Sequence, residues 1–227
     1  MKPFIISGIH SNIYALQKVF NSTSSEEVMF LGDLVDFGPC QYEVWRVLQQ
    51  LDTKRVLGNH DFAASFGTDC RSSPCTHEAS MLTKRLITLQ YMPREVLGLL
   101  GKAERHLNIE YDGIKIYGVH ASPDDELYGY LSKEEAVSIP TGQEDLILLG
   151  DAHIPYEAKE GKKWIINACS VGIPRDGNSK ASCTILDTAK REARLHRFRY
   201  DIERMLHGLK SRLSADEKTY IFIGYVS

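Results

Sequence analysis

Two carboxylates follow the end of an apolar run in residues 29–39. Leu31 is followed directly by Gly32 and Asp33, and Asp36 comes three residues later, just before a Gly-Pro pair. A short apolar run that stops at a glycine is typical of a buried strand that delivers a charged group to the rim of a sheet. A lone aspartate in this position more often caps a helix or forms a turn.

The same arrangement occurs again later in the chain, each time with a metal-capable side chain after the glycine. The segments are residues 58–61, 118–120 and 150–153. Their polar side chains include Asn59, His60, His120, Asp151 and His153. Imidazole, carboxylate and amide oxygen are ligands of transition-metal ions. The repetition therefore favours a shared metal site over a set of unrelated turns.

Composition limits the functions that the chain can have. It has 227 residues, of which 43% are hydrophobic and 25% charged, as expected for a globular protein with a sizeable core. The net charge of -3 provides no basic field for wrapping nucleic acid, so nucleic-acid binding is disfavoured. Five cysteines without regular spacing predict reduced thiols. We see no signal peptide and no transmembrane stretch, so we expect a cytoplasmic protein without a membrane partner.

Strands and helices alternate in the part of the chain that positions the first polar groups. Apolar runs predict strands at residues 4–6, 28–31 and 55–57. Helical spacing of apolar residues follows the first two runs, with Asn12 or Ser11 as the cap of the first helix. This pattern favours a largely parallel sheet that collects ligands at the carboxyl ends of its strands.

The rest of the chain predicts a second sheet and further helices. An amphipathic helix is expected over about residues 76–91, and Asp112-Gly113 is a strong hairpin signal between two strands. The expected strands are 106–111, 114–119, 146–149, 164–166, 182–186, 193–198 and 220–226, and the expected closing helix is 202–213. There is no repeat or long linker, so we predict a single domain over residues 1–227.

Five sequence blocks occur in the order found in a known family. They are residues 8–12, 32–39, 58–61, 118–122 and 150–155. Together they resemble the calcineurin-like metallophosphoesterase superfamily, in particular its small bacterial and archaeal phosphodiesterase-like members. The likeness extends through residues 167–177 to Asp187. It implies an α/β fold of the α+β type, a four-layer αββα sandwich of two mixed sheets between helices.

The resemblance also implies a dinuclear centre, with two divalent ions such as Mn, Fe, Zn or Ni. Such a pair clamps a phosphate and acidifies a bound water. Asp33 would bridge the two ions. The remaining ligands would be His10 and His153 for one ion, and Asn59, His120 and Asp151 for the other.

Other residues of the blocks are candidates for catalysis or for binding of the substrate phosphate. By resemblance, His60 would protonate the leaving oxygen or stabilise the transition state, and Asp61 would orient its ring. Asp36 is expected either to contact the residues of the site without binding an ion itself, or to form the turn. Asn12 is a candidate for holding a phosphate oxygen, and so is Arg175.

Two positions depart from the family pattern. The family carries aspartate where this chain has Gly8, and histidine where it has Asp151. The ion held by His10 and His153 therefore loses a ligand, while Asp151 returns a carboxylate to the cluster. Either the two changes compensate and leave one tight and one loose ion, or both are erosion and leave one ion or none.

Three classes of function follow from these observations. We favour a metal-dependent phosphodiesterase or phosphatase that acts on a small phosphorylated molecule, with nucleotides among the candidates. A catalytically impaired regulatory protein that binds metal or nucleotide stays open because of Gly8. A serine/threonine protein phosphatase is disfavoured by Phe37 and Asp61, where that group carries arginine and glutamate. Residues 62–76 and 123–130 would set the substrate, and homo-oligomerisation is left open.

Overall fold

Ten strands form two sheets of five in the computed structural model, which describes residues 2–23, 27–51, 53–140, 142–161 and 163–213. The first sheet has the order β10 (Glu192–Phe198), β9 (Ala181–Asp187), β1 (Phe4–Ile6), β2 (Val28–Phe30) and β3 (Thr53–Arg55). The second has the order β4 (His106–Tyr111), β5 (Ile114–Val119), β6 (Leu146–Leu149), β8 (Lys163–Asn167) and β7 (Tyr156–Glu160). The strand expected at 220–226 lies outside the described residues.

Both sheets combine parallel and antiparallel pairs. In the first sheet β1, β2 and β3 run parallel as far as the edge, β9 pairs antiparallel with β1, and β10 pairs antiparallel with β9. In the second sheet β5, β6 and β8 run parallel between the antiparallel edge strands β4 and β7. Two mixed sheets with flanking helices confirm the predicted fold class.

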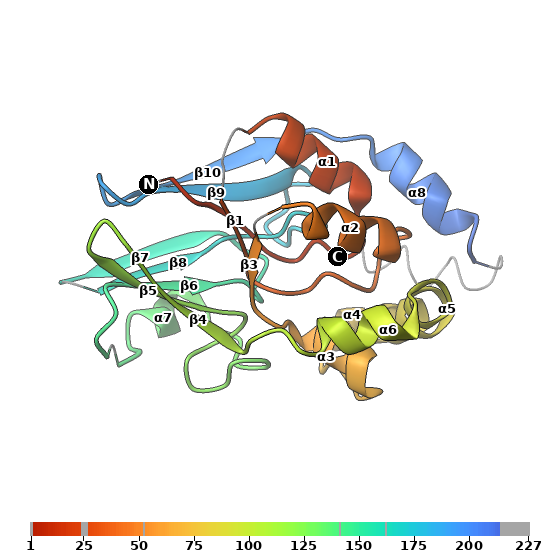
Figure 1. Ribbon diagram of the computed structural model, residues 1–227, viewed down its shortest axis with the longest axis horizontal. Coiled ribbons are helices and arrows are strands. Elements are labelled where there is room, and N and C mark those ends of the chain that lie inside the picture. Colours follow the sequence, from red (N-terminus) through yellow and green to blue (C-terminus); the bar gives the residue numbers. More distant parts are fainter. Residues whose placement is uncertain (1, 24–26, 52, 141, 162, 214–227) are drawn as a thin grey trace.

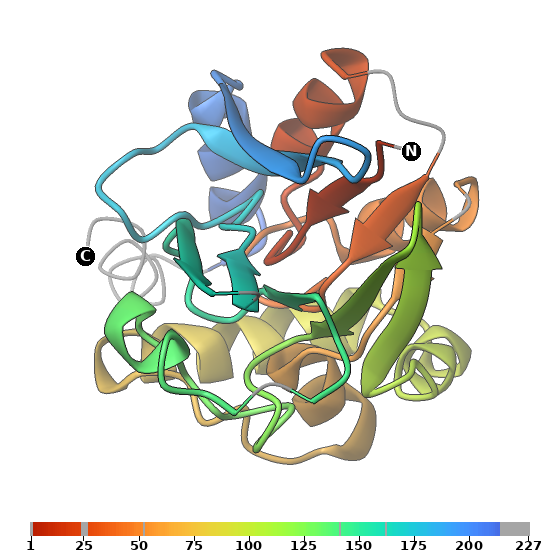
Figure 2. The same ribbon diagram turned by 90° about the vertical axis from the view of Figure 1, so that its left-hand side faces the viewer.

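Alternate side chains of each strand contribute to different layers of the core, as the two-residue period of a strand requires. In β1, Phe4 and Ile6 pack against the helices α1 (Ile13–Asn21) and α2 (Gln41–Gln49), whereas Ile5 packs against the second sheet. Figures 1 and 2 show the two sheets one above the other, with α1, α2 and α8 (Ile202–Lys210) covering the first.

The outer face of the second sheet is covered near α7 (Lys133–Ala136). Ile147 of β6 and Ile165 of β8 pack there with Ala136. Leu148 faces the opposite way and packs between the sheets. Each sheet thus buries both of its faces, which explains the uninterrupted apolar sequence of β6.

A separate group of helices lies at one end of the molecule, on the right in Figure 1. It contains α3 (Asn59–Phe66), α4 (Pro74–Thr83), α5 (Leu89–Tyr91) and α6 (Arg94–Leu100). The helix expected at 76–91 is interrupted by a π-helix, η1 (Lys84–Thr88). The apolar spacing of this segment does not distinguish a π turn from an α turn.

Other differences from the predicted elements have local reasons. β7 was not predicted, because only Ala158 of its five residues is buried and the rest are polar or half-exposed. β3 ends at Arg55, and Val56 instead forms an isolated bridge with Glu104. The hairpin prediction is confirmed, with both Asp112 and Gly113 at positive φ.

Among the described residues, no helix has the length and apolar character needed to cross a membrane.

Candidate metal centre

The polar residues singled out in the sequence meet at the carboxyl ends of five strands. His10 follows β1, Asp33 follows β2, Asn59 follows β3, His120 follows β5 and Asp151 follows β6. All five belong to loops or helix starts immediately beyond a strand, where open α/β sheets bind their ligands.

Several of these residues have strained backbones. His10, Asp33, Asp36 and His153 have φ of 47°, 66°, 68° and 56°, in the left-handed region. Each such residue costs about 1–3 kcal/mol and persists only where the surroundings impose it. Concentration of this strain at one place supports a functional site.

Three buried histidines are held in the same way by backbone carbonyls. The Nδ1 atom lies 3.0 Å from the Val35 oxygen in His10, and 2.6 Å from the Leu31 oxygen in His120. In His153 it lies 2.8 Å from the Ile173 oxygen. A carbonyl can only accept, so each Nδ1 carries the proton and each ring presents Nε2 to the site.

His10 and His153 face each other through these Nε2 atoms, which are 3.3 Å apart. Burial lowers the pKa of both rings well below the ordinary value, helped for His10 by the neighbouring His153 and for His153 by Arg175. Two neutral rings whose protons are on Nδ1 have no hydrogen bond to share here. Their two Nε2 lone pairs instead point to a common position where a metal ion could bind. Asp33 Oδ2 lies 3.6 Å from His10 Nε2 and is the third candidate ligand atom.

A second donor cluster surrounds His120 Nε2. It lies 3.2 Å from Asn59 Oδ1, and 3.5 Å from both Asp33 Oδ2 and Asp151 Oδ1. The Asn59 amide is oriented by donation from Nδ2 to the Cys70 carbonyl, 2.8 Å away. Burial disfavours a charged His120, but the Asp33 and Asp151 carboxylates outweigh it and raise its pKa to about 9. The two carboxylates of this cluster therefore stabilise a positive charge placed between them.

The residues fit a pair of divalent ions that share one carboxylate. His10, Asp33 and His153 place one ligand atom each within 4.8 Å of one another, and so do Asp33, His120 and Asp151. Asp33 belongs to both groups. Mixed nitrogen and oxygen donors suit Mn, Fe, Zn or Ni.

His60 is oriented by Asp36, and not by Asp61 as we expected. Its Nδ1 donates to Asp36 Oδ2 at 2.9 Å, and Thr88 Oγ1 donates to Asp36 Oδ1 at 2.8 Å. Burial opposes protonation of His60, but the Asp33 charge and the Asp36 hydrogen bond raise its pKa well above the ordinary value. The ring is thus prepared to act as an acid.

Asp61 holds the backbone around Asp33. Its carboxylate accepts from the N–H groups of Asp33, Leu34 and Val35 at 2.9, 2.8 and 3.2 Å. It is fully buried, and none of its hydrogen bonds within the described residues reaches the His60 ring. The sequence could not separate the roles of Asp36 and Asp61, because both are aspartates close to His60.

Of the two residues expected to hold a phosphate oxygen, only Arg175 has a free donor group. Asn12 is fully buried, caps α1 through Ala15 N, and donates to the Gly172 carbonyl and the Tyr200 hydroxyl. It therefore has no free group for a phosphate, contrary to our expectation. Arg175 lines the cavity beside the two donor clusters, and its Nε has no hydrogen-bond partner in the described chain.

Gly8 lies beside the His10–His153 pair with φ of +52°. A Cβ at this position would come within 2.7 Å of His153 Nε2 and of Ser170 Oγ. Ser170 is fixed there by donation to the Gly8 carbonyl at 2.6 Å. The place of an aspartate side chain is thus taken by the His153 ring.

The cavity over both clusters has a volume of about 180 Å³ and contains residues that we did not single out. Its lining includes Arg71, Ser72 and Ser73 from the loop after α3, and Tyr128 and Tyr130 from the loop after β5. Both loops belong to the segments predicted to set the substrate. No pattern in the sequence distinguishes Arg71 from other surface arginines.

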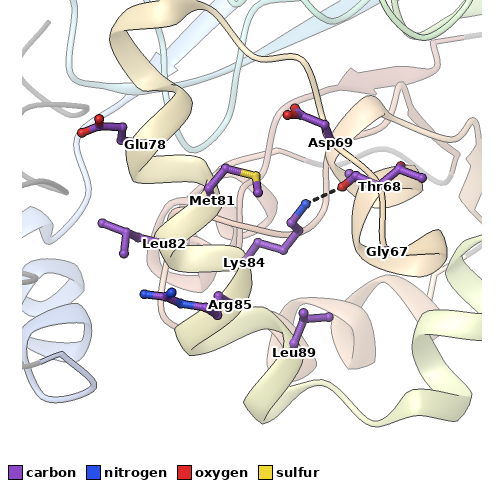
Figure 3. Close-up of a pocket in the computed structure, with 10 residues that line it drawn as sticks. Gly67, Thr68, Asp69, Glu78, Met81, Leu82, Lys84, Arg85 and Leu89 are labelled. Atoms are coloured by element: carbon purple, nitrogen blue, oxygen red, sulfur yellow. Dashed lines mark hydrogen bonds between the residues drawn. The ribbon is translucent and has the colours of Figure 1, made fainter.

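A larger cavity of about 760 Å³ lies away from the two donor clusters that share Asp33. Figure 3 shows it between α4, η1 and residues 67–69, with Lys84 reaching across to the Thr68 carbonyl at 2.5 Å. Its lining combines apolar side chains with Asp69, Glu78, Lys84 and Arg85, and contains no residue of the two donor clusters that share Asp33. Size alone therefore does not identify the active site.

Comparison with known proteins agrees with the site geometry. Residues 1–191 match the family model of the calcineurin-like phosphoesterase superfamily domain. An uncharacterised protein of Methanocaldococcus jannaschii is 30% identical, with 97% of each chain covered.

Two solved structures share the fold over nearly the whole chain. A metallophosphoesterase from Sphaerobacter thermophilus has a TM-score of 0.80 and 25% identity, covering 99% of each chain. A hypothetical protein from Pyrococcus horikoshii has a TM-score of 0.85 and 18% identity, covering 99% of this chain and 98% of that one. The match to the family model over residues 1–191 shows that the chain belongs to the calcineurin-like phosphoesterase superfamily.

Proposed function

We propose that this protein is a metal-dependent phosphoesterase that hydrolyses a phosphodiester or phosphomonoester of a small phosphorylated molecule. The observation that carries the proposal is the convergence of two donor clusters on Asp33. The ligands would be His10, Asp33 and His153 for one ion, and Asp33, Asn59, His120 and Asp151 for the other. When bound, two divalent ions supply concentrated positive charge and an acidified water.

The chain's own residues supply the remaining requirements of the reaction. His60 lines the cavity, and because Nδ1 is bonded to Asp36, Nε2 is the nitrogen that can protonate the leaving oxygen. The Arg175 guanidinium offers charged donors to the phosphate oxygens. Asp61 keeps the loop that carries Asp33 in its strained conformation.

The test is hydrolysis of bis-p-nitrophenyl phosphate by protein that is first stripped of metal and then given Mn²⁺. We expect activity to return with Mn²⁺ and to fall more than about a hundredfold in Asp33→Asn, because both ions lose a ligand. Absence of hydrolysis with Mn, Fe, Zn and Ni, on this diester and on p-nitrophenyl phosphate, would contradict the proposal.

The two ions should bind with different affinities. Gly8 gives the His10–His153 ion no side-chain ligand, whereas Asp151 adds a carboxylate to the other ion. We expect calorimetry with Mn²⁺ to resolve two events whose Kd values differ at least about tenfold, with Asp151→Asn weakening the tighter one. Two equal events would contradict this asymmetry.

A second candidate function rests on Gly8 alone. If the ion beside His10 and His153 does not bind, the protein would be a regulatory protein that binds one metal ion and a phosphorylated ligand. A single calorimetric event together with no hydrolysis of either ester would favour this candidate.

A further inference from the structure

Two arginine side chains reach the metal-centre cavity from different loops. Arg71 lies in the loop between α3 and α4, and Arg175 lies in the loop after β8. Among the ion pairs of the described residues, none involves either guanidinium. The cavity therefore offers two guanidinium groups to an anionic ligand, beside the Asp33 and Asp151 carboxylates that bound metal ions would neutralise.

The two guanidiniums serve different sides of the centre. The Arg175 backbone N–H donates to the His153 carbonyl at 3.0 Å, so Arg175 lies beside the His10–His153 pair. Arg71 directly follows Cys70, whose carbonyl holds the Asn59 amide. The Arg71 side chain lines the same cavity as His60. Arg71 can therefore reach a group that leaves toward His60.

Arg71 is held in place by its surroundings. Its backbone has φ of 52°, and its N–H donates to Asp69 Oδ1 at 2.7 Å. Its guanidinium stacks over the ring of Tyr128, 4.5 Å from the ring centre, so it joins the two loops that flank the cavity. A stacked guanidinium keeps its fork of donors free at the edge and loses little freedom on binding an anion.

We propose that the leaving group of the substrate carries a phosphate of its own, which binds to Arg71. This inference rests on the proposed function. Water forms the new bond to the reacting phosphorus, the bridging P–O bond breaks with its electron pair on the leaving oxygen, and His60 protonates that oxygen. One proton of the water stays on the new P–OH group, the other is released to solvent, and His60 takes a proton back from solvent.

The size of the cavity agrees with this assignment. The volume of about 180 Å³ leaves room for two phosphate groups beside the donor clusters. The remainder of the substrate would lie at the rim, where Tyr130 is 51% exposed.

The first test compares binding of imidodiphosphate and orthophosphate to Mn²⁺-loaded protein by calorimetry, with bound metal assayed afterwards. We expect the wild type to bind imidodiphosphate at least about tenfold more tightly, and Arg71→Gln to reduce this ratio to about one. The matched control is Arg204→Gln, which removes a guanidinium stacked on Tyr14 outside the cavity and should keep the ratio. A ratio near one in the wild type, or no change in Arg71→Gln, would overturn the proposal.

A kinetic test separates this proposal from the proposed function. Arg71→Gln should raise KM for ADP at least about tenfold more than KM for bis-p-nitrophenyl phosphate, which has no second phosphate. Tyr128→Phe should keep the ratio of the two KM values and Tyr128→Ala should change it. Equal losses on both substrates in Arg71→Gln would mean that Arg71 holds the reacting phosphate, and would overturn the assignment. Absence of hydrolysis by the wild type would contradict the proposed function, while the binding ratio would still test Arg71.

Discussion

Asp36 connects the chemistry at His60 to the protein behind it. One carboxylate oxygen accepts from His60 Nδ1 and the other from Thr88 Oγ1, and the residue is fully buried. The negative charge of Asp36 fixes the ring and favours its protonated form. The consequence is that Asp36 acts on the substrate only through His60.

We therefore expect Asp36→Asn to lower kcat by about a hundredfold on esters with poor leaving groups, because general-acid catalysis contributes about 10²–10⁴-fold. Hydrolysis of bis-p-nitrophenyl phosphate, whose leaving group needs little protonation, should fall less. Bound Mn²⁺ should stay the same, since Asp36 is not in either donor cluster. Equal losses on both kinds of ester would show that Asp36 has a purely structural role.

The residues of the two donor clusters could be predicted to lie together because each comes shortly after an apolar run, so the pattern that forms a strand also places a polar side chain beyond its end. Their assignment as metal ligands stays a prediction. The roles of Asp61, Asn12 and Arg71 could not be predicted in this way. Their hydrogen-bond or stacking partners lie far away in the sequence, as Asn12 with Tyr200 and Arg71 with Tyr128 illustrate.

At the scale of the element, the π-helix η1 aligns polar side chains with the loop after β2. Thr83 Oγ1 accepts from Phe37 N at 3.0 Å just before η1, and Thr88 at its end reaches Asp36. An extra residue in one turn changes the angular spacing of these two threonines, and π turns are frequent at functional sites. Apolar periodicity alone predicts a continuous α-helix here.

Thr88→Val should leave Asp36 Oδ1 without its donor and destabilise the fold by about 1–3 kcal/mol. It should also lower kcat, by less than Asp36→Asn, because Asp36 keeps its bond to His60. Thr88→Ser should restore kcat. Urea unfolding and steady-state kinetics check the two effects separately, and unchanged kcat in Thr88→Val would contradict this role.

At the scale of the whole molecule, the two sheets are joined by polar contacts as well as by their shared core. Tyr111 at the end of β4 contacts Lys54 of β3 at 2.7 Å, and both hydrogen-bond to Glu27 just before β2. Burial acts to raise the pKa of Glu27, but the hydrogen bonds from Lys54 and Tyr111 outweigh it and lower the pKa.

This lowered pKa predicts a pH-dependent contribution to the free energy of unfolding. A carboxyl with a depressed folded pKa stabilises above its unfolded pKa of about 4.3, and the stabilisation is lost as the pH falls through the folded value. Glu27→Gln should thus cost about 1 kcal/mol at pH 7 and almost nothing once the pH is well below the depressed folded pKa of Glu27. Glu160→Gln on the exposed edge strand β7 is the control. A difference that persists in acid would contradict the assignment.

The contact between Gly8 and His153 has a consequence for how such a site can change by mutation. An aspartate at position 8 would need space that the His153 ring occupies, and a backbone conformation that favours glycine. Gly8→Asp alone should therefore displace a metal ligand, even though it restores the residue typical of the family. Position 8 can carry a side chain only together with a rearrangement around His153. The effect of a substitution at position 8 therefore depends on substitutions around His153, and the order in which they can occur is constrained.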